Sequence, residues 1–158
     1  VEFGTSKKYG AEAIRAADIF GAKVILSRHF FKGTQSLKQL ETLFSKMARE
    51  KTFAVKIVTT AKKESDNDIM MEFLKKHVHK KGPKLIAFCM GQKGKRSRIG
   101  AMKSGSFLTF ASLGKGKESA EGQITITKIQ AGHSDSCKSP ETKFLVIMAN
   151  SEQCFLLL

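Results

Sequence analysis

The chain has 158 residues, and 41% of them are hydrophobic, which suffices for one domain with a sizeable core and excludes the composition of a disordered protein. The 28 lysines and arginines outnumber the 14 aspartates and glutamates, and the formal net charge of +14 favours an anionic partner such as nucleic acid or a small acidic substrate. No apolar run is long enough to predict a membrane span, and residues 1–10 lack the apolar core of a signal peptide. We therefore expect a soluble intracellular protein, cytoplasmic or plastid, with no membrane partner.

Three cysteines, Cys89, Cys137 and Cys154, are an odd number without the spacing of a zinc motif. They predict neither a disulfide framework nor a metal site, and they favour a reducing compartment. Residues 1–3 resemble the end of a strand and are not preceded by a methionine. We expect that further residues lie upstream.

Helical and strand-like patterns alternate along the chain. In order, the sequence predicts helix 9–20, strand 23–27, helix 37–47, strand 53–59, helix 66–79, strand 84–90 and strand 107–112. This alternation predicts an α/β fold with a parallel sheet, and both an open sheet and a closed barrel are compatible with it. The repeat of roughly 20 to 35 residues suits the βα units of an eight-stranded barrel, in which catalytic groups lie at the carboxyl ends of the strands.

Two basic residues occupy positions that favour chemistry. His29 follows the first predicted strand directly, although a single histidine at a strand end is more often structural. Lys56 interrupts an apolar strand, where a buried ammonium group is costly. In an apolar pocket the pKa of Lys56 would fall, and the free amine would be able to attack a carbonyl group to form a Schiff base. A lysine on an edge strand that reaches solvent along its own stem explains the sequence equally well.

Three polar segments allow both a functional and a structural interpretation. Residues 90–98 combine two glycines with dense positive charge, and as a loop they would cradle an anion, with Arg98 binding a carboxylate, or form an ordinary solvated turn. Ser119 and Gln123 lie in a later loop and would donate hydrogen bonds to a substrate. The basic segment Lys75–Lys81 resembles a nucleic-acid patch, but cations also stabilise the end of a helix.

Taken in order, residues 24–29, 54–59, 90–98, 105–112 and 119–123 resemble the last five strands and loops of type I 3-dehydroquinate dehydratase. This family consists of lyases of the shikimate pathway, which leads to chorismate and the aromatic amino acids. The most specific element is a Met-Gly-x-x-Gly-x-x-Ser-Arg pattern at residues 90–98. The resemblance covers roughly residues 1–129 and implies a (β/α)8 TIM-barrel fold, of which this chain would hold roughly strands 4 to 8 as a partial barrel.

The resemblance also implies a role for each candidate residue. Lys56 corresponds to the Schiff-base lysine, His29 to the general acid and base, and Arg98 to the arginine that binds the substrate carboxylate. Ser119 and Gln123 correspond to the loop that closes over the substrate. The implied reaction converts 3-dehydroquinate to 3-dehydroshikimate without a metal or organic cofactor, because the lysine supplies the covalent chemistry.

Departures from the family pattern bear on activity. The first three barrel strands are missing, and we expect the carboxylate that orients the histidine to be missing with them. Glu121 replaces a proline of the late loop and adds a negative charge near the expected substrate carboxylate. Because five βα units cannot close an eight-stranded barrel, we expect self-association or a complementing N-terminal fragment. The alternatives are a catalytically incomplete relic and, with less support, a basic RNA-binding module.

The last part of the chain has a different composition. Residues 130–140 are polar and resemble a linker, and residues 141–158 contain a pattern typical of a buried strand. This arrangement weakly resembles the junction in plant bifunctional enzymes, where a shikimate dehydrogenase domain follows the dehydratase. No dinucleotide-binding loop is present in the sequence, so dehydrogenase activity is not predicted.

Overall fold

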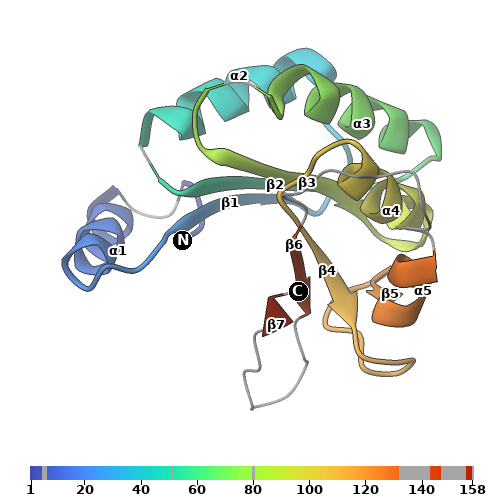
Figure 1. Ribbon diagram of the computed structural model, residues 1–158. Helices are drawn as coiled ribbons and strands as arrows, with labels where there is room; N and C mark the ends of the chain where they lie inside the picture. The colour runs from blue at the N-terminus through green and yellow to red at the C-terminus, as the bar shows by residue number, and fades with distance from the viewer. Residues whose placement is uncertain (5–6, 51, 80, 132–142, 147–155, 158) are drawn as a thin grey trace.

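The computed structural model describes residues 1–4, 7–50, 52–79, 81–131, 143–146 and 156–157 (Figure 1). Helices and strands alternate in the order α1, β1, α2, β2, α3, β3, α4 and β4, which confirms the predicted α/β architecture. Their bounds are α1 Lys7–Ile19, β1 Ile25–Phe30, α2 Leu37–Met47, β2 Ala54–Thr60, α3 Ser65–His77, β3 Lys84–Met90, α4 Lys95–Lys103 and β4 Leu108–Ser112. The shorter elements are the 3-10 turns η1 Ala48–Glu50 and η2 Gln92–Gly94, strands β5 Ile124–Thr125, β6 Lys143–Val146 and β7 Leu156–Leu157, and helix α5 Ile126–Ala131.

Strands β1, β2 and β3 form a parallel sheet in that order, as their apolar sequences predicted. The register pairs Ser27 with Lys56 and Lys56 with Ile86 across the three strands. Residues 1–3 lie along the free edge of β1, where the Phe3 N–H donates to Ser27 O and Ser27 N–H donates to Val1 O. The carboxyl ends of these strands therefore share one edge of the sheet.

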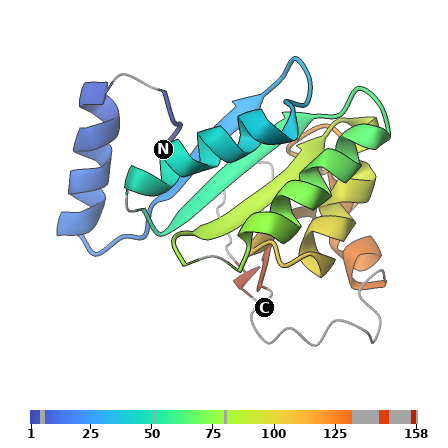
Figure 2. The same cartoon turned by 90° about the horizontal axis from the view of Figure 1, so that it is seen from above.

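Helices α2 and α3 cover one face of this sheet (Figures 1 and 2). Helix α2 begins at a capping box, in which Ser36 Oγ accepts from the Gln39 N–H and Gln39 Oε1 accepts from the Ser36 N–H. Its residues Leu40, Phe44 and Met47 are buried and belong to the same apolar core as β2 and β3. Burial of the apolar stripes of these helices stabilises the fold.

The two faces of the sheet carry different side chains because successive residues of a strand alternate. Cys89 lies on the helix-covered face, since its Sγ atom is 3.7 Å from the Asp66 carbonyl oxygen of α3. By alternation and register, His29, Lys56 and Phe88 point from the opposite face. Strand β4 lies on that side of the sheet, as Figure 1 shows.

Strand β4 joins a second sheet in the order β5, β4, β6 and β7. It pairs in parallel with both β5 and β6, while β7 runs antiparallel to β6. The β6 residues fall within the strand predicted beyond residue 140, whereas residues 132–142, most of the expected linker, lie outside the described residues. Among the described helices, none is long and apolar enough to cross a membrane.

Candidate active site

The candidate residues on the face of the sheet opposite helices α2 and α3 begin with a charged group near the start of the chain. Glu2 Oε2 accepts a hydrogen bond from His29 Nδ1 at 2.9 Å, and Glu2 Oε1 accepts from the His29 backbone N–H at 2.9 Å. Ser27 Oγ donates to the same carboxylate at 2.7 Å. Glu2 therefore fixes both the backbone and the imidazole of His29.

The Glu2 carboxylate is ionised at neutral pH. Burial opposes ionisation, but the hydrogen bonds from Ser27 and His29 outweigh it, so the pKa of Glu2 lies below its usual value of 4.5. Because an ionised carboxylate only accepts hydrogen bonds, His29 Nδ1 carries a proton, and in the neutral imidazole the lone pair therefore lies on Nε2. This tautomer suits a general base.

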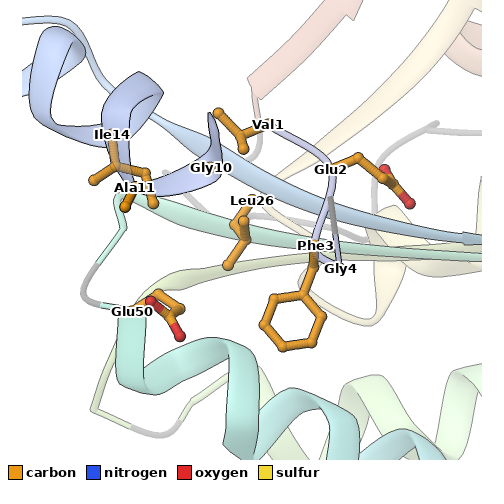
Figure 3. A pocket seen from close by; sticks show the side chains of 9 residues that line it. All are labelled: Val1, Glu2, Phe3, Gly4, Gly10, Ala11, Ile14, Leu26 and Glu50. Atoms are coloured by element: carbon orange, nitrogen blue, oxygen red, sulfur yellow. The ribbon is translucent and has the colours of Figure 1, made fainter. Parts of the chain in front are cut away.

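Glu2 corrects the expectation that no carboxylate in this chain orients the histidine. Figure 3 shows the Glu2 side chain pointing away from Leu26 and Ile14, which line an apolar cavity of about 400 Å³ beside α1. Its neighbour Phe3 points in another direction, as alternation along an extended segment requires. The signal was available in the sequence, because Glu2 interrupts apolar residues near a strand end as Lys56 does.

Lys56 lies in a partly buried, apolar environment. Its Nζ atom is 4.1 Å from the centre of the Phe110 ring on β4. Burial and, to a smaller extent, the positive charge of Arg98 lower the pKa of Lys56 below 10.5, although Glu2 opposes the shift. Strand β2 lies between β1 and β3, so Lys56 is not a solvated lysine on an edge strand. Because its pKa is lowered, a larger fraction of Lys56 is the free amine than for an exposed lysine at the same pH.

Arg98 is almost fully buried, with 1% of its surface exposed. Its guanidinium carbon is 4.6 Å from the centre of the Phe88 ring, and Phe88 in turn contacts Phe110 with ring centres 5.8 Å apart. Burial lowers the pKa of Arg98 to about 10, and its Nε atom has no hydrogen-bond partner among the described residues. A buried cation of this kind favours an anionic ligand.

The segment 90–98 is only partly a loop, which corrects the prediction. Residues Gln92–Gly94 form η2, and α4 begins at Lys95, so Arg98 projects from a helix. A Cβ atom at Gly94 would lie 2.7 Å from the Cys89 carbonyl carbon, which explains why glycine is required there. Ser97 Oγ accepts from the Cys89 N–H at 2.7 Å and so fixes α4 on the end of β3.

Ser119 and Gln123 lie together in the loop between β4 and β5. Gln123 Oε1 accepts from Ser119 N–H at 2.7 Å and from Ser119 Oγ at 3.1 Å. The Gly91 N–H donates to the Glu121 carbonyl at 3.1 Å, so the loop is attached to the turn that follows β3. The contacts of the described residues join Ser119 to Gln123 and do not join either side chain to Arg98 or Lys56.

The basic segment Lys75–Lys81 has a structural role at its start. Lys76 forms ion pairs with Glu72 and Glu41, with N–O distances of 3.1 and 3.8 Å, at the carboxyl end of α3. His77 is buried and packs against Phe44 and Phe73. Lys80 lies outside the described residues, and within the described part no three His, Cys, Asp or Glu side chains are grouped to hold a metal ion.

Comparison with known proteins identifies one family. The family model for type I 3-dehydroquinase matches residues 1–135. A 3-dehydroquinate dehydratase of Dehalococcoides mccartyi is 38% identical over 108 residues, which are 68% of this chain and 47% of that protein. The chloroplastic bifunctional 3-dehydroquinate dehydratase/shikimate dehydrogenase of Arabidopsis thaliana is 34% identical over 122 residues, 77% of this chain and 19% of that protein.

Solved structures share the fold. The 3-dehydroquinate dehydratase of Geobacillus kaustophilus superposes with a TM-score of 0.76 at 23% identity, covering 84% of this chain and 50% of that one. This chain thus spans about half the length of the single-function relatives that it matches. On the match of the family model to most of its length, the chain belongs to the type I 3-dehydroquinase family.

Proposed function

We propose that this chain carries the Schiff-base part of a 3-dehydroquinate dehydratase active site, with Lys56 as the covalent amine and His29 as the acid and base. The observation that carries the proposal is the grouping of a partly buried lysine of lowered pKa and a buried arginine around Phe88 and Phe110. On the same face, Glu2 holds His29 in the tautomer of a base. Type I relatives are named for this reaction.

The reaction begins when the Lys56 amine attacks the ketone of 3-dehydroquinate and releases water to form an imine. The protonated imine withdraws electrons, so His29 Nε2 can remove a proton from the adjacent carbon. The electron pair then expels the hydroxyl group, which leaves as water with the proton from His29. Hydrolysis of the imine consumes one water, returns Lys56 and releases 3-dehydroshikimate, so the net change is the loss of one water.

The remaining candidates would bind the substrate. Arg98 offers a guanidinium group for the carboxylate, and the low exposure of that group makes an ion pair stronger than at the surface. When the loop closes, the hydrogen bonds between Ser119 and Gln123 would break, and both side chains would form hydrogen bonds with the substrate instead. Glu121 is exposed, and its charge would weaken binding of an anion at the mouth of the site.

We further propose that the chain corresponds to strands 4 to 8 of a (β/α)8 barrel. Residues 1–3 and strands β1 to β4 give five strand segments in the same order, and the parallel pairing of β1, β2 and β3 supports the assignment. A complementing fragment would then supply strands 1 to 3, or self-association of two copies would cover the open edges. The relatives in plants and fission yeast also carry shikimate dehydrogenase, so a fused partner domain is a second possible neighbour.

Product formation tests the proposed activity. Incubation with 3-dehydroquinate should produce the conjugated product, which absorbs in the ultraviolet, and both Lys56→Ala and His29→Gln should abolish the signal. Equal rates in the variants and the unaltered chain would contradict the assignment. An RNA-binding function is not favoured, because Lys76 is already neutralised by two glutamates.

A further inference from the structure

A second cavity, of about 560 Å³, lies between α4, α5 and the loop that joins β4 to β5. Figure 1 shows α5 directly beside α4. Lys56, His29 and Arg98 do not line this cavity, and Gln123 is the one candidate site residue that it shares with the active site. The proposed lyase chemistry uses Gln123 but does not account for the three lysines of the lining.

The charges around this cavity are unbalanced. Lys95, Lys115 and Lys128 approach it from three different elements, and Glu118 is the one carboxylate among its lining residues. Within the described part of the chain, none of the three lysines forms an ion pair. Lys95 is also the first residue of α4, whose amino end adds positive potential. Two positive charges therefore remain uncompensated.

Neutral donors complete the lining. The hydroxyl groups of Thr125 and Thr127 lie 3.1 Å apart and both belong to lining residues. Gln123 also contributes to the wall, while its Oε1 atom accepts two hydrogen bonds from Ser119. Ammonium and hydroxyl groups around a concave site are the donors that phosphate oxygens require.

We infer that this cavity binds the phosphate group of a small anionic molecule. The excess of two positive charges matches the charge of a phosphate group, which lies between about −1.5 and −2 at neutral pH. The volume leaves space for a small organic group beyond the phosphate. Because Gln123 touches both the cavity and Ser119, binding there restrains the loop 119–123, and this effect does not depend on the proposed reaction.

A titration of the isotope-labelled full chain with inorganic phosphate tests the inference. Sodium chloride keeps the ionic strength constant, and the amide resonances of Lys95, Thr125 and Ser119 are followed by NMR. We expect saturable shifts at all three amides. Shifts that do not saturate, or that sodium chloride alone reproduces, would overturn the inference.

Matched variants separate a site from general attraction of anions to a basic protein. Neutralising any one of the lining lysines, as in Lys128→Gln, should weaken phosphate binding roughly two- to fivefold. Glu118→Gln should strengthen binding by a similar factor, because it removes the opposing charge. Lys103→Gln, at the far end of α4, makes the same change in net charge and should leave the affinity unaltered. An equal loss in Lys103→Gln, or no gain in Glu118→Gln, would refute the site.

Discussion

At the scale of single residues, the candidate active site combines cations that are costly to bury. Lys56 and Arg98 both have pKa values below the usual ones because burial disfavours their charged forms. Phe88 and Phe110 provide aromatic faces for these groups, and cation–π contact offsets part of the cost. Buried cations of this kind lower the stability of the fold and are retained for function. Replacing one with an apolar residue should therefore reduce activity and raise the free energy of unfolding.

Lys56→Met should stabilise the fold while it removes the reactive amine. The buried ammonium is replaced by an apolar side chain, so we expect the free energy of unfolding at pH 7 to rise by about 1 kcal/mol. The folded-state pKa of Lys56 lies below 10.5, so the penalty is complete below that folded pKa and fades as pH rises toward 10.5. Urea unfolding at several pH values measures the difference. A variant less stable than the unaltered chain at pH 7 would show that Lys56 supports the fold.

Glu2→Gln should remove a contribution to stability that is present at neutral pH and is lost in acid. The pKa of Glu2 is lowered from 4.5 in the folded state, so the stabilisation is complete above 4.5 and is lost as pH falls through the folded-state pKa. The expected loss at pH 7 is less than about 1 kcal/mol, because the carboxylate is partly solvated. Unfolding measurements from acid to neutral pH should show the two proteins converge in acid, and a constant difference would contradict the hydrogen-bonded ionised carboxylate.

The sequence allowed the prediction of His29, Lys56 and Arg98 as members of one site, and the structure brings Lys56 and Arg98 to the same pair of rings. The sequence analysis did not single out Glu2, although residues 1–3 resemble the end of a strand, because it assigned the carboxylate that orients the histidine to the missing strands. The aromatic partners were also missed. Phe88 and Phe110 resemble ordinary core residues in sequence, and their contacts to cations arise only when β3 and β4 meet.

At the scale of elements, the loop 119–123 depends on a close approach between two main chains. Gly122 has φ +73°, and a Cβ atom there would lie 2.1 Å from the Gly91 carbonyl oxygen.

The strong alternation in the sequence predicted the helices and strands within a few residues of their ends. The prediction failed at 90–98, because two glycines and four basic residues indicated a loop, whereas packing of Ser97 against Cys89 supports α4.

Gly122→Ala should displace this loop, and Gly116→Ala provides a matched control. Gly116 has a similar φ of +78° but no atom within 4 Å of an added Cβ, so its substitution tests backbone strain alone. We expect Gly116→Ala to cost about 1 kcal/mol of stability and Gly122→Ala to cost more. Trypsin cleavage after Lys115 or Lys117 should accelerate much more in Gly122→Ala. Equal effects of the two substitutions would show that the loop does not rest on Gly91.

At the scale of the whole molecule, the chain matches about half the length of its single-function relatives, yet its described part includes an acid–base pair, a candidate amine and a candidate anion-binding arginine. The net charge of +14 suits an anionic substrate but does not identify one. The chemistry of the proposed function therefore depends on a single atom, the Nζ of Lys56.

Trapping of the imine tests this claim most directly. The chain is incubated with 3-dehydroquinate and borohydride, which reduces an imine to a stable amine, and its intact mass is then measured. We predict one adduct per chain, located at Lys56 by peptide mapping and absent in Lys56→Ala. The absence of an adduct on the folded chain, or an adduct that persists in Lys56→Ala, would contradict the assignment of Lys56 as the covalent amine.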